Sequence, residues 1–233
     1  MKTMCAKERV FIMSDTVKKL KDPGSAITHF IAMMMAFFAA FPLVIKAFSE
    51  GTRVWVSCLV FILSMILLYG ASTIYHSFDK GDRINKILKK FDHAMIFVLI
   101  AGSYTPVCIL VLGGRVGIGL LALVWSVAII GIIFKMCWVT CPKWLSSAMY
   151  IAMGWMCVLA FSPIMNNLER NEFLWLLLGG IIYTVGGIIY AIRTPRVLAF
   201  NNRHRMFGTH EIFHVFVMVG SMCHFIMLYN FIG

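Results

Sequence analysis

The sequence predicts an all-α integral membrane protein with seven transmembrane helices. Of its 233 residues 61% are hydrophobic, whereas about 45 to 50% of residues are apolar in a typical soluble domain. The apolar residues fall into seven runs of about 20 residues, the length of helix that crosses ~30 Å of hydrocarbon. Because the connections are short, we expect a single membrane domain over residues 1–233, in which 1–23 form a short basic segment before the first helix.

The expected helices follow one another with little chain between them. They cover residues 24–48, 54–77, 92–112, 116–138, 144–163, 173–192 and 208–232. The first run lacks a small-residue cleavage site, so we expect it to be retained as a helix rather than removed as a signal. In the sixth run Gly179 and Gly186 are seven residues apart, which predicts a face that another helix approaches closely. The stretch 193–207, with four arginines, is interpreted as a mobile loop.

The distribution of Lys and Arg predicts the orientation, because these residues collect in the short cytoplasmic loops of membrane proteins. Seventeen of the 21 basic residues fall before the first helix or in the connections on that same side. We therefore expect a cytoplasmic N-terminus and an external C-terminus in the plasma membrane. An anionic inner leaflet accounts for the net charge of +11. No nucleic-acid motif is present, so the expected partners are membrane lipids, and the oligomeric state is left open.

The most informative motif is His210-Glu211-Ile212-Phe213-His214, which opens the seventh helix. Residues four apart lie one above the other on a helix, so His210 and His214 can present two nitrogens to one ion. Polar side chains within membrane helices are costly and usually mark function. This motif therefore predicts half of a metal site.

The predicted topology brings further polar residues to the same depth. The second helix ends inside with His76, with Ser72 one turn deeper, and the third begins inside with Asp92. Three imidazoles and one open position are the ligand set of a catalytic zinc site. We therefore expect Zn²⁺ on His76, His210 and His214, although imidazoles alone also suit iron or copper.

Each candidate also has a simpler interpretation. His76 suits a helix end at the interface, Asp92 suits the N-cap of the third helix, and Ser72 suits a close contact between helices. His93 is interpreted as a packing or supporting residue, and His29 as a reserve candidate at the start of the first helix.

Two further patterns suggest other zinc chemistry. H-E-x-x-H is also the motif of zinc proteases, in which the glutamate, here Glu211, acts as general base. Cys137 and Cys141 are four residues apart, but without a second pair they predict a zinc site only weakly.

Four stretches resemble the hemolysin III family, which belongs with the progestin and adipoQ receptors and, more distantly, the alkaline ceramidases. They are residues 71–76 (ASTIYH), 90–93 (KFDH), 101–106 (AGSYTP) and 210–214 (HEIFH). The resemblance implies seven helices, zinc held by His76, His210 and His214, and a water oriented by Asp92 beside Ser72. It is poorer in the first helix, where the family tends to have Glu, Asn and a Ser-His or Thr-His step. This chain has Asp22, Ser25, Thr28 and His29 there, so the role of that first motif is left open.

The expected activity is zinc-dependent hydrolysis of a lipid amide or ester that enters from the inner leaflet. Asp92 would act as general base and Ser72 would help to place water or the developing oxyanion. Two alternatives remain open. One is a sensor or regulator of membrane composition without turnover, and the other is the cytolytic, pore-forming role in the family's name.

Overall fold

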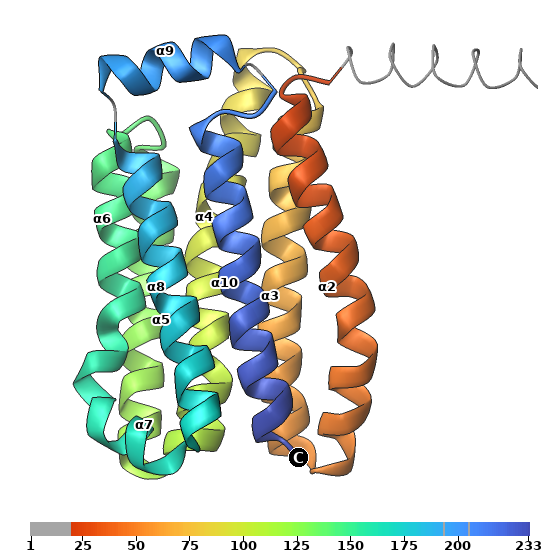
Figure 1. Cartoon of the computed structure of the whole chain (residues 1–233), viewed down its shortest axis with the longest axis vertical. Helices are drawn as coiled ribbons and strands as arrows, with labels where there is room; N and C mark the ends of the chain where they lie inside the picture. The colour runs from red at the N-terminus through yellow and green to blue at the C-terminus, as the bar shows by residue number, and fades with distance from the viewer. Residues whose placement is uncertain (1–19, 193, 205) are drawn as a thin grey trace, which may run out of the picture.

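The computed structural model describes residues 20–192, 194–204 and 206–233, and its long helices lie side by side in one bundle (Figure 1). Seven helical stretches are long and apolar enough to span a membrane, as predicted. They are α2 (Pro23–Ser49), α3 (Thr52–Ser77), α4 with η1 (Asp82–Leu112), α5 (Gly114–Cys137), α6 with η2 and α7 (Lys143–Asn167), α8 (Arg170–Ala191) and α10 (Thr209–Phe231). The start of α2 and the C-terminus lie at opposite ends of the bundle (Figure 1), as an odd number of spans requires. Which end faces the cytoplasm stays a prediction, and most of the basic segment 1–23 lies outside the described residues.

The third span begins ten residues earlier than predicted. The expected start was residue 92, but α4 begins at Asp82. Residues 82–91 carry Arg83, Lys86, Lys89 and Lys90 and are largely exposed, so their low hydropathy hid a helix that extends past the apolar run. Asp92 consequently lies in the third turn of α4, and its interpretation as a helix N-cap is wrong.

The stretch interpreted as a mobile loop contains a helix. Residues Pro195–Arg203 form α9, whose N-cap Thr194 accepts a hydrogen bond at Oγ1 from the Val197 N–H at 3.3 Å. Proline at the first helical position and threonine at the N-cap are both favourable starts. Figure 1 shows α9 lying across one end of the bundle instead of along it.

The fifth span departs from regular α-helix where a neighbouring side chain supports the backbone. The fifth span changes to a 3₁₀ helix, η2 (Trp155–Ala160), after Gly154. There the Tyr104 hydroxyl donates to the Gly154 carbonyl at 2.6 Å and accepts from the Cys157 N–H at 2.8 Å. Backbone groups freed inside a membrane need such partners, so Tyr104 on α4 makes the break tolerable.

The interface between α8 and α10 confirms the prediction from the glycine spacing. A Cβ on Gly179 would lie 2.4 Å from the His224 ring, and one on Gly186 would lie 2.6 Å from Phe216. Further along, Ser221 on α10 hydrogen-bonds the hydroxyls of Tyr69 on α3 and Tyr183 on α8, both at 2.7 Å. These contacts hold α10 between α3 and α8, with its first turn facing the ends of α2 and α3.

Candidate metal centre

Three histidines from two helices meet at the end of the bundle where α10 begins. Donor nitrogens of His76, His210 and His214 all lie within 4.8 Å of one another, so together they could hold a metal ion. His76 and His214 are buried, and His210 is partly buried. We call these three residues the histidine cluster. Helical spacing brings His210 and His214 together, but only the packing of α3 against α10 adds His76.

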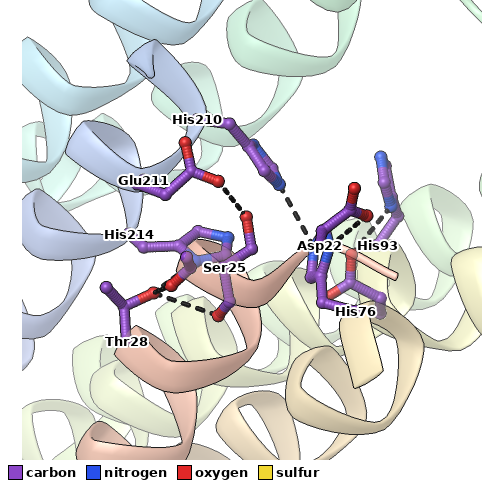
Figure 2. A network of polar contacts seen from close by, with 10 residues as sticks. Asp22, Ser25, Thr28, His76, His93, His210, Glu211 and His214 are labelled. Atoms are coloured by element: carbon purple, nitrogen blue, oxygen red, sulfur yellow. Dashed lines mark hydrogen bonds and ion pairs between the residues drawn. The ribbon is translucent and has the colours of Figure 1, made fainter. Parts of the chain in front are cut away.

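Two of the three imidazoles are oriented by contacts from α2. His76 Nδ1 lies 3.0 Å from Asp22 Oδ2, and His214 Nδ1 lies 3.2 Å from Thr28 Oγ1 (Figure 2). Histidines that bind metals usually engage their second nitrogen with such a partner, which sets the tautomer and the direction of the ring. In both residues the Nε2 atom is thereby left for another ligand. The hydrogen bond to His76 also holds the pKa of the Asp22 carboxyl below its ordinary value.

The separation of two nitrogens matches shared coordination. His210 Nε2 lies 3.2 Å from His76 Nε2. Two nitrogens bound at 2.0 to 2.1 Å to one tetrahedral zinc ion would lie roughly 3.3 Å apart. The donor set therefore fits zinc.

Glu211 is directed towards helix ends rather than towards the histidine cluster. It accepts a hydrogen bond from the Ser25 hydroxyl of α2 (Figure 2). Its Oε2 also accepts from the Gly208 N–H at 2.8 Å. Gly24 makes this approach possible, because a Cβ there would lie 1.9 Å from the Met206 carbonyl oxygen. The start of α2 is thus fastened to the start of α10 beside the histidine cluster.

Asp92 and His93 line the cavity that reaches His210 and His214, and Ser72 lies one helical turn from His76 on α3. Asp92 is buried, and its Oδ2 lies 3.3 Å from His93 Nδ1, which agrees with a supporting role for His93. Ser72 is fully buried, and its hydroxyl has no hydrogen-bond partner among the described residues. A buried polar group left unpaired costs about 1 to 3 kcal/mol, so the Ser72 hydroxyl is suited to a ligand or water.

His29, the reserve candidate, stacks directly on a cluster member. Its ring centroid lies 3.5 Å from that of His214, with 13° between the planes. Both of its ring nitrogens are buried and lack a partner within the part of the chain that the structure describes. It is not one of the three residues that could jointly hold an ion, but it adds a further unpaired polar group at the same place.

A cavity of about 180 Å³ extends from the histidine cluster into the bundle. His29, Asp92, His210 and His214 line one end of it. The rest of the lining is mainly apolar and reaches His224. His224 is 14 residues after His210 on α10, which corresponds to roughly 21 Å at 1.5 Å per residue. The cavity thus joins a polar end to a long apolar channel.

The sequence reasoning left the role of Asp22, Ser25 and Thr28 open, yet all three contact the site. The available signal was their spacing, since polar residues at 22, 25 and 28 lie within one sector of an otherwise apolar helix. Cys137 and Cys141 form no metal-binding group with a third ligand among the described residues. Cys141 instead lies 3.0 Å from the Nζ of Lys135.

Comparison with known proteins finds one matching family model and several similar chains. Residues 17–225 match the family model described as "Haemolysin-III related". The chain is 38% identical to "Hemolysin-3" of Bacillus cereus over 92% of both chains. It is 39% identical to "Hemolysin-3 homolog" of Bacillus subtilis, over 87% of this chain and 90% of that one. A shorter similarity, 31% over 37% of this chain and 26% of the relative, links it to "ADIPOR-like receptor IZH2" of Saccharomyces cerevisiae.

Proposed function

Because the chain belongs to the haemolysin-III-related family of multi-pass membrane proteins, we propose that its histidine cluster binds zinc and that the site hydrolyses lipid amides or esters. The observation that carries the proposal is the convergence of three imidazoles beside a buried carboxylate at the mouth of an apolar cavity. When bound, zinc would supply Lewis-acid chemistry, polarising a carbonyl and acidifying water.

The residues around the cluster have the chemistry that hydrolysis needs. Asp92 offers a carboxylate oxygen that can accept the proton of an attacking water, as a general base. The Ser72 hydroxyl, without a partner of its own, can donate to an oxygen that develops negative charge. Asp22 and Thr28 keep the His76 and His214 rings in position, so two of the three ligand nitrogens need little reorganisation to bind.

The shape of the cavity supports a lipid substrate. A single aliphatic chain fits an apolar channel that begins at the reactive groups. Three residues that line the cavity at the η2 break are also exposed on the outer surface, namely Trp155 (39%), Val158 (55%) and Phe161 (47%). A lipid could therefore enter sideways from the membrane. Both carboxylate oxygens of Glu211 already accept hydrogen bonds, one from Ser25 and one from Gly208. This favours Asp92 over Glu211 as the general base, and therefore lipid hydrolysis over proteolysis.

Metal content tests the first half of the proposal. Detergent-purified protein should carry about one zinc per chain by mass spectrometry, and the His76→Ala, His210→Ala, His214→Ala triple variant should carry none. Wild-type protein without metal after zinc supplementation would refute the zinc site and the hydrolase together.

A single carboxylate tests the second half. Asp92→Asn should keep its zinc but lose lipid hydrolysis by roughly a hundredfold or more, the scale of general-base catalysis, with long-chain N-acyl amides and esters as substrates. Undiminished turnover by Asp92→Asn would show that another group acts as base.

The names of the Bacillus relatives, "Hemolysin-3" and "Hemolysin-3 homolog", favour lysis as a second candidate function. It predicts that the purified chain releases dye from liposomes and that His210→Ala does so equally well. Dye release that requires the histidine cluster would instead tie membrane damage to the zinc site.

A further inference from the structure

Helix α9 has no place in the hydrolase mechanism, yet it is regular and well capped. Each of its nine residues is at least partly exposed. Nine helical residues span only about 14 Å, less than half of a bilayer core. Figure 1 shows the helix lying across the bundle end, level with the start of α2 and the first turn of α10. This is the position of a helix that lies in the membrane interface.

The faces of α9 differ in the way that an interface requires. Val197 and Asn201, one turn apart, are half-buried and face the protein. Leu198 and Phe200 flank that side and are 48% and 39% exposed. Arg196 and Arg203, seven residues apart and therefore on one face, point away from it and are exposed. Apolar side chains towards the hydrocarbon with arginines at headgroup level are typical of interfacial helices.

The charge at this end of the bundle selects the lipid. Besides the two arginines of α9, the described residues here include several basic side chains on the start of α4 and on the adjoining connections. They are Lys21, Lys80, Arg83, Lys86, Lys89, Lys90 and Lys143. Acidic residues are fewer at this end, so anionic headgroups are attracted to it, by about 1 kcal/mol for each basic residue near a charged surface.

A pair of hydrogen bonds connects α9 to the histidine cluster. Asn201 Oδ1 accepts from the Thr209 N–H at 2.8 Å, and Asn201 Nδ2 donates to Thr209 Oγ1 at 3.1 Å. Thr209 is the first residue of α10 and directly precedes His210. A side chain of α9 thus satisfies one of the free N–H groups at the start of α10, as an N-cap would. Movement of α9 would act on the turn that carries His210.

We propose that α9 binds anionic phospholipid through Arg196 and Arg203, and that bound lipid stabilises the first turn of α10 through Asn201. The partner is the anionic membrane surface itself. The inference does not depend on zinc or on hydrolysis, since it concerns only the seating of α9 and the contact it makes with Thr209.

The test compares the full chain in nanodiscs of zwitterionic phosphatidylcholine with nanodiscs that also contain anionic phosphatidylglycerol. Anionic lipid should raise the unfolding temperature and slow hydrogen exchange in residues 195–203 and 208–212. Arg196→Gln with Arg203→Gln should lose most of both effects, because each arginine should carry roughly a fivefold preference for the anionic surface. The matched control, Arg53→Gln with Arg115→Gln, removes the same charge from exposed residues at the opposite end and should retain both effects.

Further comparisons distinguish lipid binding by α9 from the coupling of α9 to the first turn of α10. Asn201→Ala should keep the lipid-dependent protection of 195–203 but lose that of 208–212. Unchanged protection of 208–212 in Asn201→Ala would overturn the coupling. Equal lipid effects in wild type and the α9 arginine variant would overturn the binding site, as would an equal effect of soluble glycerol phosphate, which would point to a free phosphate site instead of a membrane surface.

Discussion

Two buried polar clusters at the end of the bundle where α2 and α10 begin differ in whether their polar atoms have partners. In the lysine cluster, Lys135 on α5 is fully buried and its Nζ donates to Cys141 Sγ at 3.0 Å and to Ser146 Oγ at 2.6 Å. Around the histidine cluster, Ser72 Oγ, His210 Nδ1 and both nitrogens of His29 are buried without a partner among the described residues.

The difference separates a structural cluster from a candidate binding site. Hydrogen bonds between buried polar groups offset the free energy of removing those groups from water, whereas each unpaired group costs about 1 to 3 kcal/mol. A fold that keeps several unpaired groups together gains nothing from them unless something else occupies the space. In the described residues Lys135 has hydrogen-bond partners for its ammonium group, whereas the groups around the histidine cluster keep donors and acceptors for the ligand proposed above.

The largest expected effect on stability comes from removing a hydrogen bond of the lysine cluster. Ser146→Ala should lower the free energy of unfolding by about 2 kcal/mol, because it leaves a buried donor of Lys135 without its shortest hydrogen bond. The loss should be smaller when Lys135→Met is already present, since removal of both partners is nearly neutral. Equal losses in the two backgrounds, measured by denaturant unfolding in detergent, would show that the Lys135 contact is not what Ser146 contributes.

An intermediate effect is expected on metal affinity. Asp22→Asn should weaken zinc binding by roughly tenfold, at the lower end of the range for groups that orient metal ligands, because Asp22 is about half exposed with 46% side-chain accessibility. Thr28→Val, which removes a neutral partner from His214, should cost less. Competition with a chelator of known affinity gives both values, and affinities equal to wild type would show that α2 does not orient the ligands.

The smallest effect on stability is expected from Ser72, the buried serine one turn from His76. Ser72→Ala should not lower the unfolding free energy of the zinc-free protein and should raise it by up to about 1 kcal/mol, because it removes a buried hydroxyl that bonds nothing in the described chain. Its zinc content should match wild type while hydrolysis falls. A stability loss as large as that of Ser146→Ala would reveal a structural partner for Ser72 and remove the contrast between the two clusters.

The sequence by itself determined what depends on local repetition. Apolar runs of membrane length predicted the seven spans, and helical periodicity placed His210 and His214 on one face. Glycines seven apart predicted the close approach of α8 and α10. These features follow from the dimensions of a helix and a bilayer, which every segment obeys independently of its neighbours.

Only the tertiary structure decided which helices meet at the site. Residues 82–91 and 195–203 are helical although their hydropathy is low, because a helix needs a face to pack or a membrane surface to lie on, not an apolar run. Asp22 and Thr28 became partners of His76 and His214 because α2 packs against both α3 and α10, which no spacing within one helix encodes. The chain's local pattern thus supplied the candidate histidines, and the packing of α2, α3 and α10 brought the three together and oriented two of them.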